Sequence, residues 1–318
     1  INYYVGFTML NLDRTTDEEV DSATAMMRIN TIERPGDYYE NYIYAILNAS
    51  LSNHAEATRV LENLAKRYPA KTELFPMLAK SYAAQGNFDK AIATIDSLEK
   101  TEGRTVTTTS MKVNYLFNTG DTAAIINNGK LLLHDAPNSA VPNALMGNIF
   151  AQLNMPDSAF AYYDRALIIE PDYGYANLQK AYLYNSLGDS TNYEKEISAT
   201  LLNKNIDVDT KVDILTDYIR DCIQQGDSSA RVDNMFRTIL NQHPHEAQIR
   251  HLFSDYLSFK KDYKNAAEQL SYVLDIDPSD PKNWERLIWL EIFNNNYDKA
   301  IESGKKAVEY APDELSLY

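Results

Sequence analysis

The segment Phe88–Ile92 reads FDKAI, and it returns as YDKAI at Tyr297–Ile301. A looser copy, YKNAA, occupies Tyr263–Ala267. In each copy a helix breaker, Gly or Pro, stands twelve residues after the first alanine, and Ala57 and Ala159 are followed by proline at the same distance. A small residue that recurs at a fixed distance from a helix breaker indicates an internal repeat of helical units.

The repeat has a period of 34 residues. Residues 38–314 divide into eight units, of which the fifth carries four extra residues and the sixth carries one. Residues 1–37 read as a degenerate N-terminal hairpin, with Asp13–Val20 inserted between its helices, and residues 315–318 read as the start of a truncated further unit. The predicted unit starts are Tyr38, Thr72, Val106, Ala140, Gly174, Val212, Ala247 and Pro281.

Small residues dominate two columns of this alignment, where two helices must approach closely. Each unit also has two apolar stripes of helical period, so we expect a pair of helices per unit that buries its apolar face by stacking on its neighbours. The eighth residues are Ala45, Ala79, Val113, Gly147, Ala181, Ile219, Ser254 and Ile288, and the twentieth are Ala57, Ala91, Ile125, Ala159, Tyr193, Arg231, Ala266 and Ala300.

This pattern resembles the tetratricopeptide repeat (TPR), whose signature combines Trp-x2-Leu-Gly-x2-Tyr with Ala-x3-Phe and a closing Pro. In the last unit Trp284, Leu287, Ala300, Ala307 and Pro312 fall in register with it. The resemblance implies an all-α fold, a right-handed α-α superhelix (a TPR solenoid) of about eight to nine helical hairpins.

Composition narrows the class of partner. The formal net charge of −15 repels phosphate backbones and anionic membrane surfaces, so we expect neither nucleic acid nor direct membrane insertion. No run of 18 apolar residues is present, and the single cysteine, Cys222, excludes an intramolecular disulfide. The low cysteine count and the start at Ile1 slightly favour the cell envelope or periplasm, as a lipoprotein, with the cytoplasm as the alternative.

No pattern typical of catalysis is found. Glycine-rich phosphate loops, the zinc motif H-E-x-x-H and an EF-hand loop do not occur, so no catalytic residue, cofactor or metal is predicted. Gly-Asp-Ser at residues 188–190 and 226–228 is interpreted as a repeated interhelical turn rather than an esterase nucleophile, because it recurs in register with the repeat. His243, His245 and His251 are interpreted as a helix boundary rather than a metal site.

The resemblance also implies a binding surface. In TPR arrays that bind peptides, the ninth residue of each first helix faces a concave groove. We expect an extended, partly acidic segment along Lys80, Asn114, Asn148, Tyr182 and Arg220. The full predicted face comprises Lys80, Asn114, Asn148, Tyr182, Arg220, Asp255 and Trp289, with Tyr39 and Tyr42 beside them.

Two functions remain open at this point. The first is a non-catalytic scaffold that holds a peptide or partner protein in this groove. The second is the regulatory or docking portion of a larger enzyme whose catalytic domain lies outside the chain. The four extra residues of the fifth unit, near Asn203–Asp209, are expected to lengthen the loop between two units.

Overall fold

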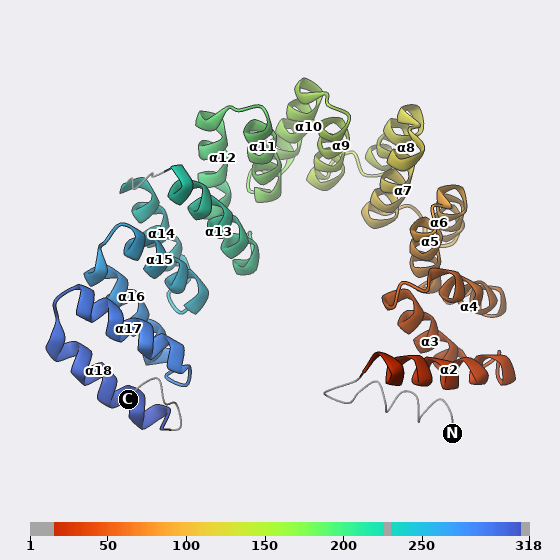
Figure 1. The fold of residues 1–318 in the computed structure, drawn as a ribbon. Coiled ribbons are helices and arrows are strands. Elements are labelled where there is room, and N and C mark those ends of the chain that lie inside the picture. Colours follow the sequence, from red (N-terminus) through yellow and green to blue (C-terminus); the bar gives the residue numbers. More distant parts are fainter. Residues whose placement is uncertain (1–15, 226–229, 313–318) are drawn as a thin grey trace. The chain divides into compact units, whose positions relative to one another are not determined.

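The computed structural model describes residues 16–225 and 230–312. Within these residues the chain forms seventeen α-helices and no β-strand, which confirms the all-α class. The helices, drawn in Figure 1, are α2 (Asp17–Glu33), α3 (Tyr38–Ser50), α4 (His54–Arg67), α5 (Leu74–Ala84), α6 (Phe88–Glu102), α7 (Val106–Thr119), α8 (Thr122–Asp135), α9 (Ala140–Gln152), α10 (Pro156–Ile169), α11 (Gly174–Ser186), α12 (Ser190–Leu202), α13 (Val208–Gln225), α14 (Ala230–Gln242), α15 (Ala247–Phe259), α16 (Tyr263–Ile276), α17 (Pro281–Phe293) and α18 (Tyr297–Tyr310).

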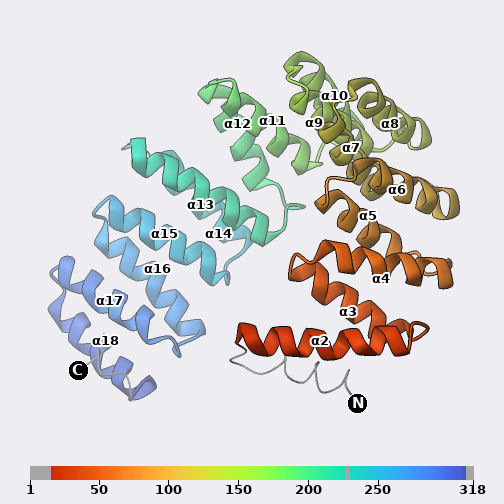
Figure 2. The same ribbon diagram turned by 45° about the vertical axis from the view of Figure 1, so that its right-hand side comes forward.

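After α2, the described helices alternate in the order expected for hairpins, and seven consecutive pairs are in contact: α3–α4, α5–α6, α7–α8, α9–α10, α11–α12, α15–α16 and α17–α18. Between them, α13 and α14 occupy the places of the sixth pair, with α13 contacting α15 and α14 contacting α12 and α15. We call the first helix of each hairpin its A helix and the second its B helix. The chain divides into two compact units, Ile1–Ile169 with α2 to α10 and Glu170–Tyr318 with α11 to α18. In the first unit, two views place the B helices α4, α6 and α8 on the same side of the A helices α3, α5 and α7 (Figure 1 and Figure 2).

Small residues lie where the helices of a hairpin cross. Ala57, Ala91 and Ala159 are completely buried. Gly147 lies at a close crossing, because a Cβ atom there would be 2.3 Å from Cε1 of Tyr163 on the partner helix. These contacts explain why the sequence keeps small residues at both columns of the repeat.

Each unit has its own apolar core. In the first unit, Met27, Tyr44, Leu61 and Leu74 are buried across α2 to α5. In the second, the buried cluster extends from α11 to α18, and Phe236 stacks on Phe253 with ring centroids 4.5 Å apart. Burial between successive hairpins adds to burial within each one, as is typical of a solenoid.

Gly-Asp pairs form the turns inside the hairpins. Gly120 ends α7 in the left-handed conformation (φ 76°), and the Asp121 carboxylate accepts a hydrogen bond of 2.9 Å from the backbone N–H of Ala124. Gly188 and Asp189 repeat the arrangement at the start of α12. The third copy, at residues 226–228, lies outside the described residues.

The linker after the fifth unit is longer than most of the described linkers between units. It spans residues 203–207, whereas others span 103–105, 136–139, 170–173, 243–246 and 277–280, and the linker between α4 and α5 spans 68–73. The helix start differs from the expectation, because α13 begins at Val208, four residues before the predicted unit start, and reaches 18 residues. Asp207 explains the early start, because its carboxylate accepts hydrogen bonds from the N–H and hydroxyl of Thr210, both at 2.8 Å.

The predicted insertion Asp13–Val20 is also wrong over its described part. Asp17–Val20 forms the first turn of α2, where Thr16 and Glu19 make a capping box: the Thr16 N–H donates to Oε2 of Glu19 at 2.8 Å. The remainder of that insertion, the predicted helix before it and residues 315–318 lie outside the described residues. Among the predicted unit starts, Thr72 precedes its helix by two residues, since α5 begins at Leu74.

Candidate partner-binding face

The ninth position of the A helices carries exposed side chains beside buried ones. Lys80, Asn114 and Asp255 are exposed, although Ala79, Val113 and Ser254, the preceding residues, are buried. Among the aromatic members, Tyr182 is 48% exposed and Trp289 52% exposed. We call this set the A-helix face: Lys80, Asn114, Asn148, Tyr182, Arg220, Asp255 and Trp289, with Tyr39 and Tyr42.

In the first unit, two members are available to a partner. The side chains of Lys80 and Asn114 have no ion-pair or hydrogen-bond partner within the described residues, and both are exposed. An ammonium group attracts a carboxylate, and a side-chain amide both donates and accepts hydrogen bonds. These groups suit a polypeptide backbone with an acidic side chain.

Asn148 differs from the other members. It is half-buried, and its Oδ1 accepts a hydrogen bond of 2.8 Å from the hydroxyl of Tyr163. Burial raises the pKa of Tyr163, so this hydroxyl stays protonated and remains a donor. Part of the hydrogen-bonding capacity of Asn148 is therefore used inside the hairpin.

The tyrosines at the start of α3 form an aromatic cluster. Tyr38 stacks on Tyr42 at 5.6 Å and meets Tyr39 edge-on at 5.4 Å. The Tyr38 hydroxyl donates to Oε1 of Glu73 at 2.7 Å, and burial followed by this bond raises its pKa. Tyr39 remains 72% exposed, so the cluster presents one broad ring surface to a partner.

The second unit has a charged and aromatic portion of the face. Burial and the carboxylates of Asp217 and Asp213 on α13 raise the pKa of Tyr182 on α11. Arg220 donates to Oδ1 of Asp217 at 2.8 Å, one turn away on an exposed surface. An exposed pair of this kind contributes little stability, so Arg220 can exchange its partner for a ligand carboxylate.

Two groups on α17 complete this portion. Arg286 pairs with Asp255 of α15 across neighbouring A helices. Trp289 stacks on Phe293 at 6.0 Å, and Phe293 contacts the ring of Tyr263 at 5.3 Å. The sequence analysis did not predict Arg286 as part of the face. Arg286 follows Asp255 by 31 residues, one helical turn less than the 34-residue period, and this spacing could have indicated an ion pair between neighbouring A helices.

One comparison with known proteins agrees with the repeat. A family model described as tetratricopeptide repeat matches residues 45–105, which include α4, α5 and α6. Residues 45–105 therefore match the tetratricopeptide repeat in sequence. No curated protein matches it.

Solved structures similar to this chain have low sequence identity to it. The human IFIT1 dimer with m7Gppp-AAAA is 16% identical, with a TM-score of 0.42, over 98% of this chain and 72% of that one. YrrB, a TPR protein with an unusual peptide-binding site, is 16% identical, with a TM-score of 0.38, over 59% and 95%. A TPR protein from Parabacteroides merdae is 16% identical, with a TM-score of 0.42, over 80% and 98%.

In the part of the chain that the structure describes, no group of three or more His, Cys, Asp or Glu side chains is placed to share a metal ion. Of the helices described here, none has the length and hydrophobicity that crossing a bilayer requires. His243, considered in the sequence as part of a histidine cluster, has its Nε2 3.2 Å from Nζ of Lys211.

Proposed function

We propose that the chain is a non-catalytic scaffold that binds a partner polypeptide along its A-helix face. The TPR fold suggests a protein-interaction scaffold, and the face supplies the chemistry that such a role needs. The proposal applies to the portion of the face in each unit separately: Lys80 and Asn114 with the tyrosines of α3 in the first, and Tyr182, Arg220 and Trp289 in the second.

One observation carries the proposal. At the ninth position, polar and aromatic side chains are exposed on α5, α7, α11, α13, α15 and α17, whereas Asn148 on α9 is half-buried. The preceding residue is buried in each of these six helices except α17, where Ile288 is half-buried. Large aromatic surfaces such as Trp289 and Tyr182 lose contact with water when a partner covers them, and rings contribute strongly to protein interfaces. A row of this composition is better suited to a polypeptide than to a phosphate backbone, which the net charge of −15 repels.

The partner is expected to be extended and partly acidic. Lys80 offers an ammonium group to a carboxylate, and Asn114 can pair with a backbone amide in both directions. Because Asn148 is partly engaged by Tyr163, we assign it a supporting contact through its side-chain NH₂.

The experiment compares two double variants in a quantitative assay with a partner captured by the wild-type chain. Lys80→Ala with Asn114→Ala changes the face. Lys130→Ala with Asn127→Ala removes the same two residue types from exposed positions on the B helix α8. We expect the first variant to weaken binding by about 1–3 kcal/mol and the second to leave it unchanged. Equal affinity of both variants, with both folded by circular dichroism, would place the partner elsewhere.

A further inference from the structure

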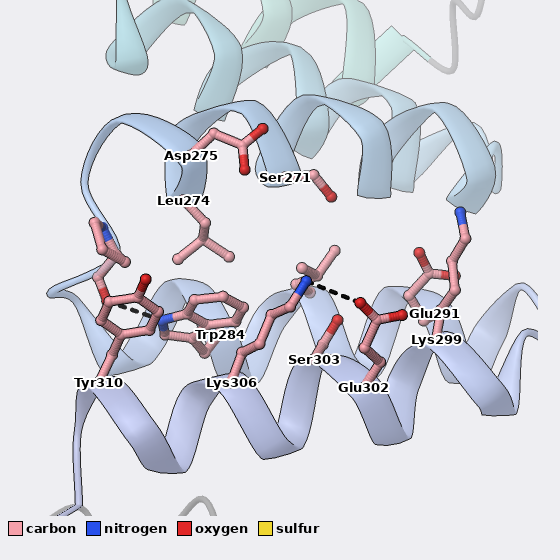
Figure 3. Close-up of a pocket in the computed structure, with 12 residues that line it drawn as sticks. Ser271, Leu274, Asp275, Trp284, Glu291, Lys299, Glu302, Ser303, Lys306 and Tyr310 are labelled. Atoms are coloured by element: carbon pink, nitrogen blue, oxygen red, sulfur yellow. Dashed lines mark hydrogen bonds and ion pairs between the residues drawn. The ribbon is translucent and has the colours of Figure 1, made fainter.

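A pocket of about 410 Å³ lies between α16 and α18, with α17 as its floor. A neighbouring pocket of about 430 Å³ shares Ser271, Asp275, Glu291 and Lys299 with it. None of the nine residues of the A-helix face lines either pocket. Figure 3 shows Trp284 and Tyr310 at one end of the first pocket and Glu291 with Lys299 at the other.

Glu291 is the unusual member of this lining. Its residue is 5% exposed, and its Oε2 is buried without a hydrogen-bond partner among the described residues. A desolvated carboxylate oxygen without a partner is costly, so its presence calls for a reason. Figure 3 shows the carboxylate directed into the space between α16 and α18.

A charged residue at the position of Glu291 is unusual within the repeat. Glu291 is the eleventh residue of its unit, where the TPR signature has tyrosine. It is also the one charged residue in that column, whose other members are Asn48, Tyr82, Leu116, Phe150, Tyr184, Cys222 and Leu257. The fold does not need a charge at this position, because seven other units form without one.

The residues of α17 that form the floor of the pocket change from apolar at one end to anionic at the other. Trp284, Leu287 and Glu291 are spaced by three and four residues, so they lie along one face of α17. Trp284 and Leu287 are 5% and 4% exposed. A ligand lying along this face would meet an aromatic ring, then an aliphatic side chain, then a carboxylate.

The lysines of the lining do not neutralise Glu291. Lys306 is paired with Glu302 at 2.9 Å. Lys299 lines both pockets, but its Nζ makes no ion pair with the Glu291 carboxylate. The first pocket also contains the exposed Asp275, so three carboxylates face two lysines, which favours a cation over an anion.

We propose that this pocket binds an alkylammonium or alkylguanidinium group, with the cationic head at Glu291 and the alkyl stem along Leu287. Such a group supplies N–H donors to a carboxylate and has an apolar stem that matches the graded floor. A metal ion is a poorer ligand, because the carboxylates of the described residues do not form a group able to share one. The shared chemistry has two sources, an arginine or lysine side chain of a polypeptide and a small aliphatic amine.

The test measures binding of two probes to the full 318-residue chain. Nα-acetyl-arginine methylamide represents a side chain, and spermidine represents an aliphatic amine; both are titrated calorimetrically at millimolar concentrations. We expect at least one to bind, and Glu291→Gln to weaken it at least tenfold. Glu285→Gln, the same change at an exposed position of α17, should leave it unchanged. The probe that binds identifies the source. No binding of either probe to the wild-type chain, or equal binding to Glu291→Gln, overturns the proposal.

A second variant guards against misfolding. Glu291→Leu places a leucine where Leu116 and Leu257 stand in other units, so it should fold, melt at a higher temperature than the wild type and bind no probe. Probe-induced stabilisation, measured as a shift in melting temperature, should be present in the wild type and absent in this variant. The same shift in both proteins would show that the probes bind elsewhere, and would overturn the proposal even if Glu291→Gln were unfolded.

Discussion

Gly147 shows how closely the two helices of a hairpin approach. An added Cβ would be 2.3 Å from Cε1 of Tyr163, whose ring is 1% exposed and whose hydroxyl is bonded to Asn148. We expect Gly147→Ala to force this ring aside and to lower the free energy of unfolding by about 1–3 kcal/mol, measured by urea denaturation.

Gly304 provides the matched control for this prediction. It lies inside α18, where an added Cβ would be 3.9 Å from Cδ1 of Ile288, an ordinary contact. Gly304→Ala should therefore stabilise the chain, by about 0.5–1 kcal/mol, because alanine favours a helix interior. If both alanine variants were stabilising, the close approach at Gly147 would be refuted.

Lys211 has a charge that the fold disfavours. Its side chain is fully buried, with Nζ 3.1 Å from Oε1 of Gln242, and burial lowers its pKa below the ordinary value. The ammonium group of Lys211 therefore loses its proton at a lower pH in the folded chain than in the unfolded chain. As a result, the contribution of Lys211 to the free energy of unfolding rises with pH, and it levels off above the ordinary lysine pKa of about 10.5.

The test is the difference in stability between the wild type and Lys211→Met. We expect the wild type to gain on the variant between pH 8 and about pH 10.5, in parallel denaturation series. Tyrosines whose pKa is raised, such as Tyr44, destabilise both proteins alike at high pH and cancel in the difference. A difference independent of pH would mean that Lys211 is not desolvated.

The start of α13 is the element-scale feature on which sequence and structure disagree. The Asp207 carboxylate caps α13 and accepts a hydrogen bond of 2.8 Å from the hydroxyl of Tyr175 on α11. These bonds to Thr210 and Tyr175 lower the pKa of Asp207 to about 2. Its contribution to stability is present above about pH 4 and is lost as pH falls towards 2.

We therefore expect Asp207→Ala to lower the melting temperature by a few degrees at neutral pH, and the deficit to close between about pH 4 and pH 2. Asp207→Asn serves as the control, since asparagine is also a good N-cap residue but does not titrate. A deficit that persists unchanged at pH 2 would show that the carboxylate charge plays no part.

The element assignments illustrate what periodicity can predict. The all-α class was predictable because a small-residue column recurs at a fixed distance from a helix breaker, and α7, α9 and α11 begin 34 residues apart. The early start of α13 was not predictable in this way, since it depends on the Asp207–Thr210–Tyr175 bonds, and Tyr175 belongs to another hairpin. Local cap chemistry decides helix boundaries that a repeat period does not encode.

At the scale of the whole molecule, contacts are mainly between neighbouring helices. In such arrays a local defect spreads only to adjoining repeats. We expect Gly147→Ala to speed amide hydrogen exchange in α9 and α10 and in adjoining helices, while α15 to α18 keep their protection. Equal loss of protection along the chain would contradict this and would indicate a single cooperative unit.

The candidate sites were predictable to different degrees. Exposure at Lys80 and Asn114 agrees with their place in the repeat, because lysine and asparagine side chains are mostly exposed in folded proteins. The half-buried state of Asn148 depends on the hydroxyl of Tyr163, and the pocket depends on the distance between α16 and α18. Neither feature could be predicted from the sequence, because both depend on how the helices pack. The sequence does show that Glu291 is the one charged residue at the eleventh position of the eight units.

The central claim is that a partner polypeptide lies on the A-helix face, and site-specific photocrosslinking tests it most directly. A benzophenone side chain is placed at Asn114 on α7 or at Lys130 on α8, both exposed positions, and each protein is irradiated with a partner identified by pull-down. The account predicts a covalent adduct from position 114 and none from position 130. Adducts from position 130 alone would contradict it.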